Sequence, residues 1–145
     1  MAPSDEGPEA VIEQSHLAWD AFLKGNPEPG KVLFSRRDDV TLGNPYGPFA
    51  RGWAEVEQTM ERAAALYRDG EAVGFEPVAT YVSDDLACLV EVERYRGKVG
   101  GADEYASIAL RVTSVLRRED GVWKIVHRHA DPITSPRAAE SVILT

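Results

Sequence analysis

The chain has 145 residues, of which 43% are hydrophobic and 28% are charged. This length provides one domain with a single core, and the composition is that of an ordinary globular protein. The net charge is −8 and the isoelectric point is near 4.9. Nucleic acids and anionic membranes both require concentrated Lys and Arg, so the sequence argues against either as a partner.

The N-terminal residues contain neither the basic region nor the apolar segment of a signal peptide. No apolar run approaches the roughly 20 residues of a membrane span. The single cysteine, Cys88, cannot form an internal disulfide and is interpreted as a buried small hydrophobe. We therefore expect a cytoplasmic protein in which residues 1–7 form a flexible arm.

Two long amphipathic helices are expected in the first half of the chain. The first follows Pro8 and ends before Gly25, and the second begins at Gly52 and ends at Asp69. Their apolar residues recur at three- and four-residue spacing: Val11, Ile12, Ala18, Trp19, Phe22 and Leu23, then Trp53, Val56, Met60, Ala63 and Tyr67. Between them the sequence predicts a short turn of helix at residues 32–34 and a short strand at residues 40–42.

The segment 43–52 contains three glycines and two prolines, which exclude regular structure. It also contains Tyr46 and Phe49, which a purely solvated loop would not need. Loops of this kind often carry function on a rigid scaffold.

After residue 71 the hydrophobic period changes from 3.6 to 2, which predicts strands. The expected strands are residues 72–82, 86–96, 104–117 and 121–131, with Pro77 marking an edge or a bulge. Helices followed by strands joined by tight turns indicate an α+β fold with an antiparallel meander. The tail, residues 133–145, contains a candidate helical turn.

Alternation along the strands divides their side chains into two faces. One set is apolar and is expected beneath the helices: Cys88, Val90, Val92, Ile108, Leu110, Val112, Ser114, Leu116 and Val126. The other is amphipathic and is expected on the outer face: Glu91, Glu93, Tyr95, Arg111, Thr113, Trp123, Ile125, His127 and His129. Glu91 and Glu93 are expected to pair with Arg111. A mixed surface of this kind is typical of a protein interface, although a bulge would reverse the assignment.

His127, His129 and Asp131 share one face of the last expected strand, which suggests either a metal site or an interface. Ligands at this spacing lie roughly 6–7 Å apart along the strand, so a metal would need ligands from neighbouring strands. We favour interface histidines bonded to glutamates across a homodimer, with no metal and no cofactor.

The closing hairpin resembles a known family. Residues 117–129 are similar to the ending of SnoaL-like and DUF4440-type domains, Arg-Arg-x-Asp-Gly-x-Trp-x-Ile-Val-His-x-His, and the order of elements over residues 8–132 resembles the NTF2-like superfamily. This resemblance implies a cone: a curved antiparallel sheet of four to six strands around two long helices and one short helix. It also implies a pocket at the open end and usually a homodimer.

The sequence departs from the ketosteroid isomerases of that superfamily. Their catalytic base aligns with Asn44, an amide that cannot accept a proton at neutral pH. Their tyrosine falls near Ala18 and their second acid near Thr113 or Ser114, so steroid isomerisation is not expected. The kinase association domains that share the hairpin have pocket arginines where this chain has Ser114 and Ala130.

The expected function is therefore a small-molecule pocket that either binds or performs mild acid/base chemistry on an apolar, carbonyl-type ligand. The alternative is a non-catalytic dimerisation module. Weak catalytic candidates are His16, Asn44 and Arg128. The expected pocket residues are Trp19, Asn44, Tyr46, Phe49, Trp53, Met60, Tyr81, Ser114 and Arg128, and the expected dimer interface contains Glu91, Glu93, Arg111, Trp123, His127 and His129.

Overall fold

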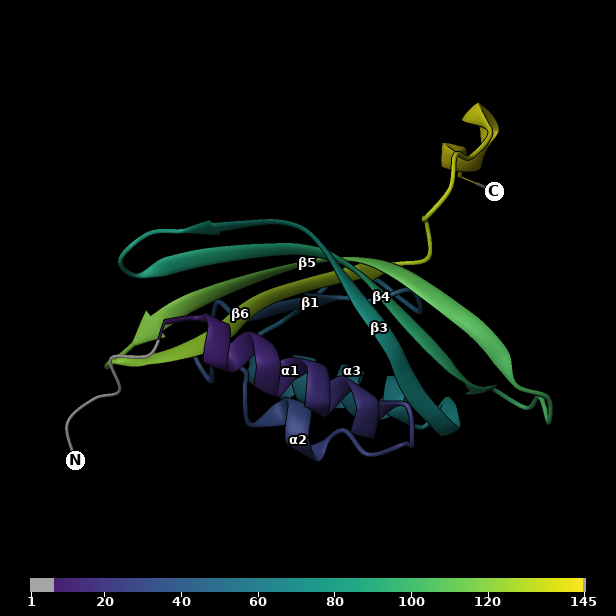
Figure 1. Ribbon diagram of the computed structural model, residues 1–145, viewed down its shortest axis with the longest axis horizontal. Coiled ribbons are helices and arrows are strands. Elements are labelled where there is room, and N and C mark those ends of the chain that lie inside the picture. The colour runs from purple at the N-terminus through teal and green to yellow at the C-terminus, as the bar shows by residue number, and fades with distance from the viewer. Residues whose placement is uncertain (1–6, 145) are drawn as a thin grey trace.

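A computed structural model describes residues 7–144, so residues 1–6 of the expected arm lie outside the described part. Three helices cover one face of a curved sheet (Figure 1). The helices are α1 (Glu9–Phe22), α2 (Glu28–Lys31) and α3 (Trp53–Ala64). The strands are β1 (Thr41–Gly43), β2 (Ala50–Arg51), β3 (Tyr67–Val82), β4 (Leu86–Val99), β5 (Ala106–Glu119) and β6 (Val122–Asp131).

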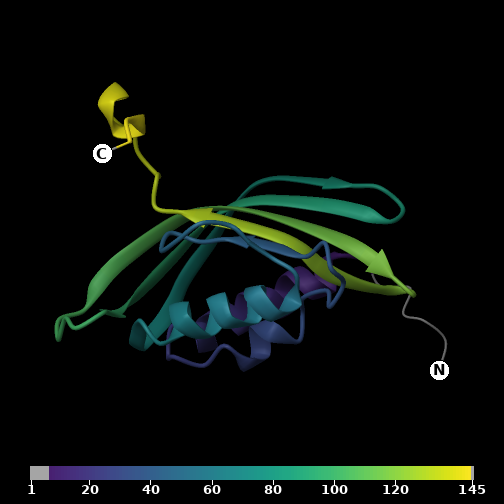
Figure 2. The same ribbon diagram turned by 180° about the vertical axis from the view of Figure 1, so that it is seen from behind.

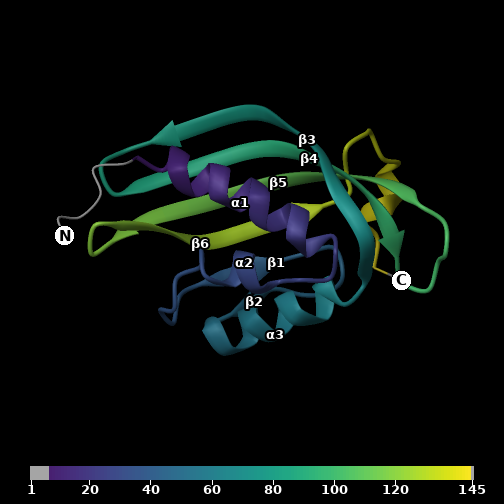
Figure 3. The ribbon, with the colours of Figure 1, turned by 60° about the horizontal axis from the view of Figure 1, so that its bottom comes forward.

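The six strands follow the order β2-β1-β6-β5-β4-β3. Strands β3 to β6 form the expected antiparallel meander, and β1 joins it in parallel to β6. Figure 3 shows the helices lying across the inner, concave face of this sheet. After β6 the chain extends away from the side that carries the helices and forms a short turn of 3-10 helix at Ala139–Val142 (Figure 2). The α+β meander predicted from the hydrophobic period is confirmed.

The boundary between α3 and β3 was wrong in the sequence-based prediction. We expected helix to Asp69, but α3 ends at Ala64 and β3 already pairs Tyr67 with Val99. Pairing with β4 therefore overrides the local helical period. β3 is an edge strand with three register shifts, one of them between Pro77 and Ala79, as expected for an interior proline.

The core lies between the helices and the inner face of the sheet. Its most enclosed apolar side chains come from all parts of the chain: Phe34, Val40, Val56, Val112, Leu116 and Ile125. Gly70 allows β3 to approach the end of α1, because a Cβ there would lie 2.7 Å from the Leu23 carbonyl oxygen. Within residues 7–144, no helix is long and apolar enough to cross a membrane.

The expected face of β4 was wrong. Glu91 and Glu93 point inward and are only 3% and 0% exposed, whereas we placed them on the outer face. The register pairs Glu91 with Val112 and Glu93 with Leu110, and paired residues share a face. Alternation alone favoured the apolar set because it could not show that the two buried carboxylates meet polar partners from elsewhere in the chain, His16 for Glu91 and Arg128 for Glu93.

A bulge in β6 explains a second correction. Val115 pairs with His127 and Leu116 pairs with Ile125, so Val126 has no partner and the alternation changes phase. Trp123 and Ile125 before the bulge are therefore buried in the core instead of lying on the outer face. After it, Arg128 and Ala130 point inward, while the histidines at 127 and 129 point outward.

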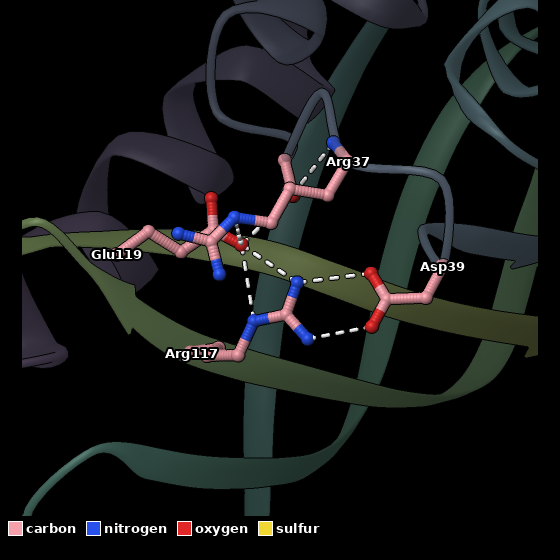
Figure 4. A network of polar contacts seen from close by, with 5 residues as sticks. Arg37, Asp39, Arg117 and Glu119 are labelled. Atoms are coloured by element: carbon pink, nitrogen blue, oxygen red, sulfur yellow. Dashed lines mark hydrogen bonds and ion pairs between the residues drawn. The ribbon is translucent and has the colours of Figure 1, made fainter.

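A polar network ties the β5–β6 hairpin to the segment that leads into β1 (Figure 4). Arg117 donates to both carboxylate oxygens of Asp39 at 2.7 and 2.9 Å and to Glu119 at 2.7 and 3.0 Å. Glu119 also accepts from the Ser35 hydroxyl at 2.8 Å. These contacts lower the pKa of Asp39 and of Glu119, although burial alone would raise the pKa of Glu119. The segment before β1 is thereby fixed, which positions the loop that follows.

Candidate functional site

A buried ion pair between Arg128 and Glu93 lies on the inner face of the sheet. Arg128 donates from its two terminal nitrogens to the two oxygens of Glu93, at 2.8 and 2.6 Å. Tyr95 also donates to Glu93, at 2.5 Å, and the Arg128 guanidinium lies 4.3 Å from the Trp19 ring centroid. The geometry is bidentate and stacked, which suits arginine and would not suit lysine. Arg128 and Glu93 together contribute no net charge.

A small cavity of about 60 Å³ lies between this ion pair, the helices and the loop after β1. Its wall is mainly apolar and consists of Trp19, Phe22, Leu23, Phe34, Leu42, Asn44, Pro45, Tyr46, Met60, Ala63, Tyr67, Tyr95, Leu110, Arg128 and Ala130. Tyr46 closes one side, and its hydroxyl lies 2.5 Å from the Tyr67 hydroxyl. The cavity is therefore apolar with a few polar groups, an arrangement typical of small-molecule sites.

Four ionisable groups in or beside the cavity wall, Tyr67, Tyr95, Arg128 and its partner Glu93, have shifted pKa values. Burial, followed by the bond with Tyr46, raises the pKa of Tyr67, and burial raises that of Tyr95. Burial alone would lower the pKa of Arg128, but the Glu93 carboxylate raises it. Burial alone would raise the pKa of Glu93, but Arg128 and Tyr95 outweigh burial and lower it. None of these four groups is therefore poised to exchange a proton near neutral pH.

His16 lies outside this wall. Its Nε2 is 2.9 and 3.1 Å from the two oxygens of Glu91, and its ring stacks on Phe75 with centroids 3.8 Å apart. Burial raises the pKa of Glu91, and the bond with His16 offsets this only in part. Neither the histidine nor its carboxylate partner lines the cavity. The pair links α1 to the sheet, so the expected histidine acid or base is not in reach of a ligand in the cavity.

The structure brings together only part of the expected pocket. Trp19, Asn44, Tyr46, Met60 and Arg128 line the cavity. Four expected residues do not: Phe49, Trp53, Tyr81 and Ser114. Trp53 packs under Arg36, Ser114 is buried in the sheet, and Tyr81 is exposed near the far end of β3. Asn44 uses its side-chain oxygen to accept from the Tyr46 backbone N–H at 2.9 Å, which shapes the loop.

Sequence reasoning missed Glu93, Tyr67 and Tyr95 as parts of the site. A signal was present: Glu91, Glu93 and Tyr95 alternate along one strand. On another strand Arg128 alternates with Val126 and Ala130, which are apolar. Two acids and one arginine on strands otherwise suited to the core indicate buried pairing. The expected pairing with Arg111 was wrong, because Arg111 instead bonds Asp131 at 2.8 Å.

The outer face carries a separate group of side chains from β1, β6 and the loop. Phe49 is 66% exposed and its ring lies 6.2 Å from His127 and 5.8 Å from His129. The Phe49 ring packs directly above Gly43. It can do so only because Gly43 has no side chain, since a Cβ there would lie 2.5 Å from the ring. His127 also bonds the Thr41 hydroxyl at 2.8 Å. Among residues 7–144, no cluster of three or more His, Cys, Asp or Glu side chains is arranged to hold a metal.

A model of the SnoaL-like domain matches residues 18–134, which is most of the chain. The chain belongs to this family. The fold is accordingly the NTF2-like cone, and solved structures share it. No functionally curated protein matches the chain.

Three structures illustrate the likeness. A putative calcium/calmodulin-dependent kinase type II association domain from Thiobacillus denitrificans is 23% identical, with a TM-score of 0.72 over 90% of this chain and 98% of that one. A putative dehydratase of the NTF2-like family from Streptomyces avermitilis is 20% identical (TM-score 0.67; 89% and 100% covered). A ketosteroid isomerase-like protein from Erwinia carotovora atroseptica is 18% identical (TM-score 0.71; 88% and 94% covered). These neighbours have differently named functions, so they define the fold and not the activity.

Proposed function

We propose that this SnoaL-like protein binds a small, uncharged, largely apolar ligand that presents a carbonyl or similar hydrogen-bond acceptor to Arg128. One observation carries the proposal: the Arg128 guanidinium lines an apolar cavity while its charge is balanced by Glu93. Arginine has five N–H donors, and Glu93 occupies two of them. A neutral acceptor can use a remaining donor, whereas an anion would meet the Glu93 carboxylate as well.

Binding without chemistry is the better supported form of this function. The wall contains no histidine and no carboxylate among the described residues, and Asn44 stands where the isomerases of the superfamily have their base. Two of the tyrosines that line it, Tyr67 and Tyr95, have their pKa raised chiefly by burial and stay protonated. A reaction that needs proton transfer would therefore lack a donor and acceptor with matched pKa values.

The test compares acetophenone, which has a neutral carbonyl, with benzoate, which has similar size and a negative charge. Acetophenone should bind at millimolar concentration or tighter in titrations followed by NMR, and benzoate should bind more weakly. Ala63→Leu should abolish binding because Ala63 lines the cavity, while Ala65→Leu, the same change at an exposed position two residues later, should not. Equal loss in both variants, or preference for benzoate, would contradict the proposal.

A second candidate function is homodimerisation through the outer face, and the exposed ring of Phe49 favours it. Phe49, His127, His129 and Arg111 share a surface on which an aromatic side chain is left two-thirds exposed. Aromatic and arginine side chains are enriched in interfaces. Glu91, Glu93 and Trp123 are buried inside the monomer and are omitted from this proposed surface.

Sedimentation equilibrium tests this dimer. Phe49→Ser should raise the dimer dissociation constant by about tenfold or more, as for a central aromatic contact. Leu17→Ser is the control, because Leu17 is 75% exposed on α1 at the opposite face of the sheet. A monomeric wild type at high protein concentration would refute the dimer.

A further inference from the structure

A second hollow lies directly outside the cavity, between the loop after β1 and helix α3. It is an open groove of about 570 Å³. Its wall consists of Asn44, Tyr46, Gly47, Pro48, Phe49, Ala50, Glu55, Gln58, Thr59, Arg62, Ala63 and Leu66. Asn44, Tyr46 and Ala63 also line the inner cavity, so the two spaces share a wall.

The helix supplies this groove with polar groups because of its periodicity. Glu55, Gln58, Thr59 and Arg62 stand at positions i, i+3, i+4 and i+7 and therefore form one stripe along α3. Val56, Met60 and Ala63 form the neighbouring buried stripe that faces the core. The inner cavity is thus apolar and the outer groove polar, although the same helix lines both.

Tyr46 is the side chain that divides the two spaces. It is 47% exposed, and within the described residues 7–144 its side chain has one hydrogen bond, with the Tyr67 hydroxyl. Rotation of the ring away from Tyr67 leaves the buried Tyr67 hydroxyl without this partner, which costs about 1–3 kcal/mol and can be offset by the contacts of a bound ligand. This displacement would open the cavity into the groove.

The size of the cavity makes this opening necessary for any ring-sized ligand. The cavity measures about 60 Å³, well below the volume of about 150 Å³ of an engineered protein cavity that binds benzene. A ligand of that size must therefore displace Tyr46, and it then reaches the polar stripe of α3. Cavity and groove become one site with an apolar end and a polar end.

The charges of the groove indicate which polar group fits it. Glu55 and Arg62 have opposite signs, and both already have partners: Glu55 accepts from the Arg51 backbone N–H at 3.0 Å and Arg62 donates to Thr59 at 3.2 Å. The amide of Gln58 and the hydroxyl of Thr59 can both donate and accept. An uncharged hydroxyl or amide is the complementary group.

We propose that the natural ligand is an elongated, uncharged amphipathic molecule, with its apolar carbonyl end in the inner cavity and a hydroxyl or amide end against Gln58 and Thr59 of α3. Tyr46 is the residue that admits it. This inference rests on the proposed function, because it assumes that the inner cavity binds the apolar end.

The experiment uses two extended forms of acetophenone, 4′-propylacetophenone and 4′-(3-hydroxypropyl)acetophenone, which differ only in the terminal hydroxyl. Affinities are measured for the wild type and for Gln58→Ala/Thr59→Ala. The wild type should bind the hydroxyl compound about 2- to 12-fold more tightly, as expected for one added hydrogen bond. The double variant should bind the two compounds equally. Gln14→Ala, an exposed glutamine on α1, should retain the wild-type preference.

The outcomes separate the two proposals. If acetophenone itself does not bind, the proposed function fails and this inference fails with it. If acetophenone binds but the hydroxyl gives no gain, or the gain persists in the double variant, the outer subsite is refuted alone. Tyr46→Ala gives an independent reading: it should speed association of 4′-propylacetophenone, and an unchanged rate would refute the role of Tyr46.

Discussion

Replacing Glu93 by Gln should destabilise the protein far more than its conservative size suggests. Glu93 is fully buried and its two oxygens bind the Arg128 guanidinium at 2.6 and 2.8 Å. The substitution leaves Arg128 charged, because arginine does not lose its proton in a protein. An uncompensated buried charge costs about 3–5 kcal/mol of unfolding free energy. For a chain of this size each kcal/mol lowers the melting temperature by about 2–4 °C.

Urea denaturation followed by circular dichroism measures this loss. Asp131→Asn is the control, since it makes the same chemical change in an ion pair with Arg111 whose side chains are 15% and 57% exposed, and the new amide oxygen can still accept from the Ile133 backbone N–H. Because the exposed Arg111 remains solvated when it loses its partner, the control should lose only about 0–1 kcal/mol. Combining Glu93→Gln with Arg128→Met should restore most of the stability, because no charge then remains buried and Gln can still accept from Tyr95. A loss in Glu93→Gln no larger than in the control, or no recovery in the double variant, would refute this reasoning.

Two further predictions concern the carboxyl group beside His16 and the contact between β3 and α1. Burial raises the pKa of Glu91 above its ordinary value of 4.5, so protonation of this carboxyl favours folding, and the contribution of Glu91 to wild-type stability is lost as pH rises above about 4.5. Glu91→Gln removes this loss, and its unfolding free energy relative to the wild type should increase between about pH 4 and pH 7; a difference independent of pH would contradict the assignment. Gly70→Ala should cost about 1–3 kcal/mol, because its Cβ would lie 2.7 Å from the Leu23 carbonyl oxygen and 2.9 Å from Leu23 Cβ. Gly74→Ala in the same strand meets nothing within 4 Å, and equal effects in thermal unfolding of the two variants would argue against the close approach.

Local patterns located the main elements of the fold but not the short ones. The helical turn expected at residues 32–34 was wrong, because the short helix α2 is Glu28–Lys31, and the segment 43–52, expected to be irregular, contains β2 at Ala50–Arg51, which pairs with β1. Three- and four-residue spacing located the two long helices, and alternation located the four strands of the meander. Pro77 indicated the irregular edge of β3, where a register shift is found. The hairpin that ends in His127 and His129 indicated the family, which the match over residues 18–134 establishes.

Only part of the candidate site could be predicted from the sequence. Five cavity residues were predicted because they lie in the helices, the loop and the strand that the resemblance to the cone fold places around its pocket: Trp19, Asn44, Tyr46, Met60 and Arg128. Phe49 comes from the same loop as Tyr46, and its chemistry alone does not show that it turns to the outer face above Gly43.

The sequence by itself indicated the two long helices, the strand meander and the family, because these depend on residue type and on spacing along the chain. Tertiary structure decided which face each strand buries. One unpaired residue, Val126, changes the phase of β6, and a bulge is set by pairing with β5 and not by local propensity. It also decided that Glu93 and Arg128, 35 positions apart, neutralise each other inside the core. Burial of a charge depends on its partner, and that partner is defined only when the chain is folded.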